Sequence, residues 1–600
     1  MAARMLLADI APSVYECQVK TAVSEVKEVG RCPGKDNSYA RLSKKELALY
    51  IVTEAATLLY LTYCVYWDSI DRTRWLEVSL EDGWSWLQRR RDIADFEWRI
   101  WYRTLWQLLL WYSAHFLLGK LLEENAPRFR NIGYLILAML SLLQMFGWKI
   151  VLLFMAHTCA VFLAASFGST AVVWATSLGL MCIMNFNIPQ IFLKSLITTQ
   201  ENKEEFVNIV NMEFGMVTLK CISFSLEKLK SQTSQSDSKD RPDSKERSDS
   251  KDRSDSKERS DSKERSDGED SQERSQNETD ASFESPASTD VDEKPCDSYS
   301  LTDLLQYTFY VPLFFFAPVV TFDTFKTQIN EKPRPWNRRK VYHAIFAFVR
   351  IAFWTFFVEF SLHHLYFSAI MRSPHILRRL SRWTLIGIEY FYLQLRMVKY
   401  FVFYSLAGQI AKLDGVDVPG PPSCIFYIYR FSDMWRLFDK GLYKFITRYI
   451  YIPLGGSRSG LSQRLFGSFV CFMFCYVYRG LDVFALVWCL FAFAELVLEI
   501  CAALLHENPM VQKFETRFLR PVWVRRLRAL FAVPGFLICM FPMNYFIAGR
   551  QMGDLYVKKM LIMGTWTPLI ITSYLLYCHI QVAIEIERIT KAKLLKLKKD

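Results

Sequence analysis

A basic and aromatic stretch, residues 425–460, holds the residues whose types and spacing point most clearly to chemistry. Its apolar residues recur at three- and four-residue spacing, which predicts one amphipathic helix that ends near Pro453 and the glycines that follow it. The opposite face of this helix carries charged residues: Arg436, Asp439, Lys440, Lys444 and Arg448. Arg436 and Asp439 stand three residues apart and can form an ion pair. Such a helix is expected to lie against a membrane or to line a channel into it.

The composition indicates that this stretch belongs to a membrane protein. Of the 600 residues, 51% are hydrophobic and 15% aromatic although 22% are charged, so the charge must be segregated. The apolar residues fall in blocks of about 18–25, long enough to cross a hydrocarbon core of about 30 Å. The sequence therefore predicts an all-α polytopic membrane protein with about 11–13 membrane helices or re-entrant segments. It excludes a soluble enzyme, a collagen and a disulfide-stapled secreted domain.

Changes in composition predict five parts: a polar cytosolic N-terminus (1–46), N-terminal membrane helices (47–230), a polar loop (231–298), C-terminal membrane helices containing the motif region 425–480 (299–580), and a basic tail (581–600). Hexamers close to Asp-Ser-Lys-Glu-Arg-Ser fill residues 237–266 and balance acids against bases, so the loop is expected to be unstructured. Lys596 and Lys598 resemble a retrieval signal of the endoplasmic reticulum, and a tail lying on the membrane is the alternative. The expected location is the endoplasmic reticulum membrane.

The net charge indicates the kind of partner, and polar residues inside apolar blocks indicate candidate functional residues. The formal net charge of +12 is spread over many loops, which favours membrane lipid headgroups over nucleic acid as the counter-charge. Polar residues inside apolar blocks are functional candidates because they are costly there. These are Glu54, His157, Glu359, His363, His364, Glu495 and Glu499. Glu495 and Glu499 stand four apart, and an acid pair, a cation site and a cavity edge all remain open for them. No metal site is predicted.

The run Met434–Gly456, MWRLFDKGLYKFITRYIYIPLGG, closely resembles the signature of the membrane-bound O-acyltransferase family, in its hedgehog acyltransferase branch. Residues 95–98, 221–226 and 299–322 resemble that branch as well. The resemblance implies a central tunnel that acyl-coenzyme A enters from the cytosol and the acceptor from the lumen, with both termini cytosolic. It implies palmitoyl-coenzyme A as the donor and the N-terminal cysteine amine of a hedgehog-like secreted protein as the acceptor.

The resemblance also implies roles for single residues. Asp439 matches the acidic residue of the family motif, and the nearby basic residues Arg436, Lys444 and Arg448 suit the phosphates of acyl-coenzyme A. Cys424 stands where hedgehog acyltransferases similarly have a cysteine that can ligate haem. The family's histidine belongs to a Trp-His-Gly run about forty residues after the acid. Here the corresponding run is Tyr476–Gly480, and Arg479 occupies the histidine position.

The replacement of the family's histidine by Arg479 leaves open whether the protein catalyses acyl transfer. A guanidinium has no free acceptor and stays protonated, so Arg479 cannot act as a general base. Loss of such a base removes about 10²–10⁴ in rate, which would abolish transfer to serine. An N-terminal amine has a pKa near 8 and is partly neutral at pH 7, so slow N-acylation can persist. Two alternatives follow: a slow acyltransferase, or a catalytically inactive homologue that binds acyl-coenzyme A or a partner and regulates palmitoylation. Arg479 itself is expected to hold a phosphate, polarise the thioester carbonyl or snorkel to the interface.

Overall fold

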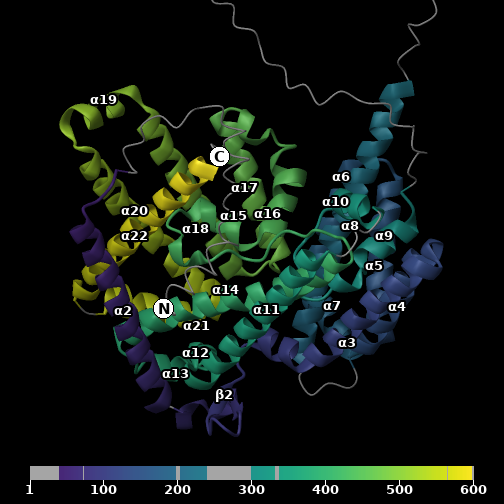
Figure 1. The fold of residues 1–600 in the computed structure, drawn as a ribbon, viewed down its shortest axis with the longest axis horizontal. Coiled ribbons are helices and arrows are strands. Elements are labelled where there is room, and N and C mark those ends of the chain that lie inside the picture. The colour runs from purple at the N-terminus through teal and green to yellow at the C-terminus, as the bar shows by residue number, and fades with distance from the viewer. Residues whose placement is uncertain are drawn as a thin grey trace, which may run out of the picture. The chain divides into compact units, whose positions relative to one another are not determined.

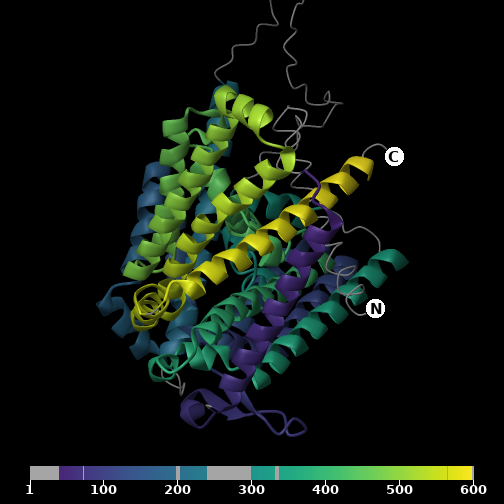
Figure 2. The same ribbon diagram turned by 90° about the vertical axis from the view of Figure 1, so that its left-hand side faces the viewer.

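The computed structural model describes residues 40–71, 73–197, 203–239, 299–331, 337–563 and 565–597. The predicted all-α class is confirmed, because these residues are almost entirely helical (Figures 1 and 2). The strands in this part of the chain are β1 (Leu80–Asp82) and β2 (Arg90–Asp92), an antiparallel pair in which Leu80 lies opposite Asp92. The chain divides into one unit of Met1–Leu229 with Leu301–Asp600 and a second unit of Lys230–Ser300.

The first half of the chain forms α2 (Lys44–Asp71), α3 (Phe96–Asn125), α4 (Arg130–Phe146), α5 (Trp148–Ser166), α6 (Thr170–Ile183), α7 (Asn187–Leu196) and α8 (Lys203–Lys239). The first residues of the predicted loop 231–298 are helical, because α8 continues to Lys239. Three features of the sequence analysis lie outside the described residues: the hexamers beyond Lys239, the N-terminus before residue 40, and Lys598 of the predicted retrieval signal.

The second half forms α9 (Leu301–Thr308), α10 (Phe322–Ile329), α11 (Arg338–His364), α12 (Phe367–Met371), α13 (Pro374–Leu377), α14 (Arg382–Leu413), α15 (Phe431–Phe438), α16 (Lys440–Ile446), α17 (Leu461–Tyr478), α18 (Val483–Glu507), α19 (Pro509–Phe518), α20 (Pro521–Ala548), α21 (Arg550–Val557) and α22 (Thr567–Leu597). Short 3₁₀ turns lie at Thr73–Ser79, Pro127–Phe129, Val311–Leu313, Ile425–Tyr427 and Gly456–Arg458, and π-helical turns lie at Thr447–Tyr451 and Lys558–Ile562.

Eight helices of the described residues are long and apolar enough to cross a membrane, or nine if α6 and α7, bent by 71°, form one broken span. The chain is thus a multi-pass membrane protein with fewer full spans than the 11–13 membrane segments expected. The apolar stretch Thr308–Phe322, which has the composition of a membrane span, is instead a buried and largely irregular segment around the turn Val311–Leu313. Its prolines explain the difference, because Pro312 and Pro318 lack the N–H that a continuous helix requires.

The long helix α14 lies at the centre of this arrangement. It packs against α2, α3, α11 and α12, and Figure 1 shows it between the N-terminal helices and the C-terminal helices α18 to α22. Gly387 permits the close approach to α2, because a Cβ atom there would lie 2.8 Å from Cγ2 of Val65. Figure 2 shows α2 beside α22, which it also contacts. Segments far apart in sequence therefore surround α14.

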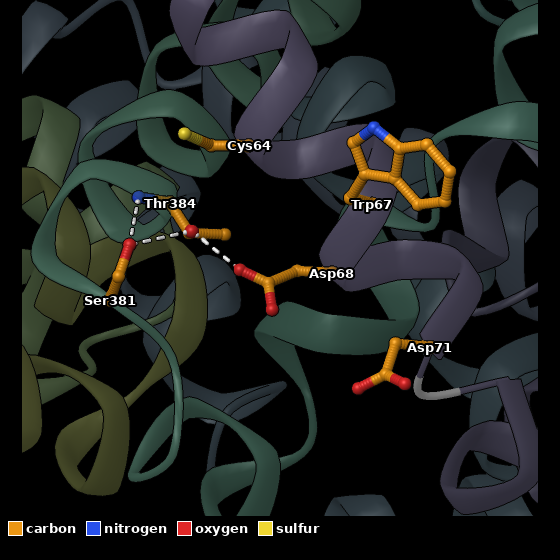
Figure 3. A pocket seen from close by; sticks show the side chains of 6 residues that line it. All are labelled: Cys64, Trp67, Asp68, Asp71, Ser381 and Thr384. Atoms are coloured by element: carbon orange, nitrogen blue, oxygen red, sulfur yellow. Dashed lines mark hydrogen bonds between the residues drawn. The ribbon is translucent and has the colours of Figure 1, made fainter.

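A pocket of about 390 Å³ lies where α2 ends and α14 begins (Figure 3), and it is lined by Cys64, Trp67, Asp68, Asp71, Ser381 and Thr384. The Thr384 hydroxyl donates a hydrogen bond of 2.5 Å to Asp68, and Ser381 caps α14 by accepting from the Thr384 amide at 3.1 Å. None of the site residues expected from the sequence lines this pocket. Its polar groups join α2 to the first turn of α14.

Candidate functional site

Asp439 breaks the single amphipathic helix that the sequence predicts. The chain instead forms α15 up to Phe438 and α16 from Lys440, followed by the π-helical turn Thr447–Tyr451. Asp439 has φ −121° and ψ 85°, and its Oδ1 accepts a hydrogen bond of 2.9 Å from the Leu442 amide. An aspartate is a favoured N-cap because its oxygen satisfies a free amide of the first turn. The break places the Asp439 side chain between two short helices.

The second carboxylate oxygen of Asp439 faces α14. It accepts a hydrogen bond of 3.1 Å from the Tyr404 hydroxyl. Burial raises the pKa of the Asp439 carboxyl, although the Leu442 amide, the Tyr404 hydroxyl and Arg479 oppose this rise. The predicted ion pair with Arg436 is not the contact that positions this carboxylate, because both of its oxygens are engaged by Leu442 and Tyr404.

We expect the hydrogen bond by which Asp439 caps α16 to contribute measurably to the free energy of unfolding. The Asp439→Ala variant should lose about 1 kcal/mol of folding free energy, because the first turn of α16 then has a free amide. Asp439→Asn should lose much less, since its side-chain oxygen can still accept from Leu442. Thermal unfolding of both variants in the same detergent provides the measurement. Equal losses in the two variants would show that the charge, and not the cap, holds this turn.

One face of α14 carries four polar residues. Tyr392, Arg396, Tyr400 and Tyr404 recur at four-residue spacing, which places them on one side of the helix. Each of these side chains is half-buried. We call these four residues, together with Asp439 and Arg479, the inner face.

Arg479 lies at the end of α17, and its side chain is exposed. Its guanidinium carbon lies 5.7 Å from the ring centre of Tyr478 and 5.9 Å from that of Phe546. The charge of Arg479 acts on Asp439, but no carboxylate of the described residues lies within 4.0 Å of it. The two positions that resemble the family signature therefore lie within electrostatic reach of each other.

The histidines of the described residues are engaged elsewhere. His115 contacts Asp414 at 3.2 Å, His157 contacts Thr218 at 2.8 Å, and His579 contacts Glu54 at 2.7 Å. His506 contacts Arg528 and stands at the far end of α18 from Arg479. A helix of that length separates the two by about 35 Å at 1.5 Å per residue. His506 is therefore no replacement for the base that Arg479 displaces.

The basic residues of the motif differ in their freedom to bind phosphate. Arg448 forms ion pairs of 2.7 Å with Glu227 and 2.8 Å with Asp323, so its charge is already matched by two carboxylates. This pairing argues against the sequence-based role of Arg448 in binding coenzyme A. Lys444 is exposed, and Arg436 is half-buried on α15. Lys444 is the better candidate for a phosphate contact.

Cys424 lies next to the motif helices. The Ser423 amide donates a hydrogen bond of 2.9 Å to the Leu437 carbonyl, which holds this loop against α15. Burial raises the pKa of the Cys424 thiol, and the Phe426 amide partly opposes this. The Phe426 ring lies 4.6 Å from the Tyr427 ring. No group of three or more potential metal ligands occurs among the described residues, and haem at Cys424 stays a prediction.

Several polar residues that the sequence marks as candidates have structural partners. Glu359 binds Arg91 at 2.7 Å, and His363 accepts from the Trp84 amide at 3.1 Å. Glu499 accepts from the Phe431 and Ser432 amides and so caps α15, whereas Glu495 packs against Gly535. Glu499 therefore has a capping role, and an acid pair of Glu495 and Glu499 stays a prediction. Arg396 and Tyr404 were not among the sequence candidates, although they belong to a set of polar residues at four-residue spacing within an apolar block, which could have revealed them.

Comparison with known proteins agrees with this geometry. The family model described as MBOAT, membrane-bound O-acyltransferase family, matches residues 162–542. The chain is 24% identical to the protein-cysteine N-palmitoyltransferase HHAT of Mus musculus, over 82% of this chain and 88% of that protein. It is 25% identical to the protein-cysteine N-palmitoyltransferase HHAT-like protein of Mus musculus, over 91% and 96%. The protein-cysteine N-palmitoyltransferase Rasp of Drosophila melanogaster is 21% identical, over 87% and 91%. The chain belongs to the membrane-bound O-acyltransferase family.

Proposed function

We propose that this protein transfers palmitoyl from acyl-coenzyme A to the N-terminal cysteine amine of a hedgehog-like secreted protein, in the membrane of the endoplasmic reticulum. Relatives named protein-cysteine N-palmitoyltransferase match most of its length, which supports this acceptor class. The observation that carries the proposal is the inner face, where the charge of Arg479 acts on Asp439 and the Tyr404 hydroxyl of α14 donates a hydrogen bond to the same carboxylate. A donor and an acceptor that are held together beside these groups would react at a raised effective concentration.

The inner face suits an amine and not a hydroxyl. A neutral amine attacks the thioester carbonyl directly, the carbon–sulfur bond breaks, and the proton released by nitrogen passes to the coenzyme A thiolate. The positive charges of Arg396 and Arg479 disfavour a neighbouring ammonium and so help to keep the acceptor amine neutral. A serine hydroxyl needs a base to remove its proton, and no histidine of the described residues contacts Asp439 or Arg479.

A second candidate function is favoured by Arg479 itself. A guanidinium at the family's histidine position cannot accept a proton, which suits a protein that binds acyl-coenzyme A or a partner without turnover and regulates palmitoylation. Both candidates use the inner face. They differ in whether an amide bond forms.

The two candidates are separated by an acyl-transfer assay with purified protein and palmitoyl-coenzyme A. The acceptors are one peptide with a free N-terminal cysteine and the same peptide with its N-terminus acetylated. The proposed enzyme forms a hydroxylamine-resistant palmitoyl amide on the first peptide alone. Donor binding without any amide product would favour the regulatory homologue over the enzyme. Product on the acetylated peptide would exclude the amine mechanism.

We further expect Lys444 to contribute to donor binding. Lys444→Ala should weaken palmitoyl-coenzyme A binding at low salt and have little effect at high salt, because exposed phosphate contacts are screened. Arg448→Ala serves as the comparison. It should act mainly on stability, because it removes the ion pair of Glu227, which then keeps only the hydrogen bond from the Tyr449 hydroxyl among the described residues. Binding titrations at two ionic strengths, with thermal unfolding of the same samples, test this. A salt-independent loss of affinity in Lys444→Ala would remove this residue from the phosphate site.

A further inference from the structure

The short helix α19 joins α18 and α20, two helices that pack against each other and are each long and apolar enough to cross a membrane. Figure 1 shows α19 at one end of α20. Because both of its neighbours enter the membrane, the connection between them lies at the membrane surface. The path of the chain therefore places α19 at the boundary between lipid and water.

One side of α19 is apolar and faces away from the protein. Met510, Phe514 and Phe518 stand four residues apart, and 81%, 57% and 65% of their surface is exposed. The rings of Phe514 and Phe518 lie 5.1 Å apart. We call these three residues the apolar stripe. On a helix at the membrane surface, such a stripe enters the outer part of the lipid layer.

The charges of α19 are divided between the protein and its surroundings. Its acid, Glu515, is directed at the protein, because it lies 3.1 Å from Arg528 of α20. Lys513 and Arg517 are exposed, as is Arg520 just after the helix, and no carboxylate of the described residues lies within 4.0 Å of these three. Helical spacing places Lys513 and Arg517 beside the apolar stripe. We call Lys513, Arg517 and Arg520 the basic edge.

The elements that end on the same side of the membrane as α19 are also basic. The start of α20 lies beside the start of α2 and the end of α22, because Arg526 lies 2.8 Å from Glu46 and Arg525 lies 2.8 Å from Glu585. Exposed basic residues near these ends are Arg41, Lys44, Lys45 and Lys591. An excess of lysine and arginine is typical of the cytosolic side, and the cytosolic leaflet carries the anionic lipids.

We propose that the apolar stripe and the basic edge together form a docking surface for anionic phospholipids of the cytosolic leaflet. The basic edge contacts the anionic headgroups, and the apolar stripe contacts the adjoining acyl chains. Glu507 is exposed nearby at the end of α18, so three positive charges stand against one negative charge. Each residue of the basic edge favours anionic over zwitterionic lipid by about fivefold. This surface is separate from the inner face, so the inference does not depend on acyl transfer.

Photocrosslinking of the purified full-length protein in phosphatidylcholine nanodiscs tests this. A trace of photoactivatable phosphatidylserine or phosphatidylcholine carries the reactive group in its acyl chain, and mass spectrometry maps the products. Phosphatidylserine should label residues 509–523 more strongly at low salt, and high salt should reduce this preference. Arg517→Gln should lower the preference about fivefold, and Arg517→Lys should keep it. Arg550→Gln removes an exposed charge at the far end of α20; it is the matched control and should behave like wild type.

Three results would overturn the inference. The first is equal labelling of residues 509–523 by the two lipids. The second is an unchanged preference when all three residues of the basic edge are replaced by glutamine. The third is labelling of α18 and α20 without any labelling of α19, which would assign the apolar stripe to a protein partner. Because the replaced side chains are exposed, thermal unfolding of the variants should match wild type, and a lost preference then reports lipid binding.

Discussion

Replacing Arg479 by histidine should raise the rate of acyl transfer to an N-terminal cysteine peptide by up to about 100-fold. A neutral imidazole can take the proton that the attacking amine releases, and the guanidinium of Arg479 cannot. Residue 479 lies at the end of α17, within electrostatic reach of Asp439, so the new side chain would lie near that carboxylate. Steady-state kinetics at saturating palmitoyl-coenzyme A provide the measurement.

Two further variants make this result interpretable. Arg382→His adds a histidine to the first turn of α14, beside Met563 and Thr565 and away from the inner face, and should leave the rate unchanged. Arg479→Ala removes the guanidinium without supplying a base, and it should retain slow transfer. If Arg479→Ala is inactive while wild type turns over, Arg479 has a positive role in the reaction, and transfer does not depend on the neutral acceptor amine alone.

Glu359→Ala should destabilise the protein by about 3–5 kcal/mol, the largest stability effect that we expect. Glu359 accepts two hydrogen bonds from Arg91, at 2.7 and 2.8 Å, and one of 2.7 Å from the indole of Trp98. Its removal leaves a buried guanidinium with only Glu81 as a partner. The contact ties the β1–β2 hairpin and the start of α3 to α11, so its loss should loosen three elements together.

The controls for this variant come from the same region. Glu359→Gln can still accept from Trp98 and should be less damaging than Glu359→Ala. Glu77 lies on the surface 3.9 Å from Arg90, and Glu77→Ala should change stability by less than about 1 kcal/mol. Thermal unfolding in detergent compares all three variants. If Glu359→Ala is as stable as Glu77→Ala, the pairing of Glu359 with Arg91 does not stabilise the fold, and a functional role for Glu359 is favoured instead.

The membrane class and the family motif could be predicted from sequence because both are local patterns. Apolar blocks identify spans, and the run from Met434 to Gly456 identifies the family without any structure. The break at Asp439 could not be separated from a continuous helix, because apolar spacing on either side of it is unchanged. A proline-containing apolar stretch such as Thr308–Phe322 resembles a span by composition, although its backbone cannot form one helix.

The polar candidates show a second limit of sequence reasoning. A buried glutamate such as Glu359 has the same appearance in sequence whether it binds substrate or an arginine 268 positions away. The same holds for Arg448, whose partners Glu227 and Asp323 come from distant segments. Long-range pairing decides which charges remain available, and a single sequence does not show that pairing.

The pH dependence of the wild-type rate tests the central claim, that transfer at the inner face proceeds without a base from the protein. The measurement is palmitoyl amide formation on a free N-terminal cysteine peptide between pH 6.5 and 9, with Arg479→His in parallel. We predict a slow wild-type rate that rises from about pH 7 to 8.5, because the acceptor amine loses its proton in that range. Arg479→His should be faster and less dependent on pH. A wild-type rate that is fast and constant across this range would contradict the claim, because it would require another residue to supply the base.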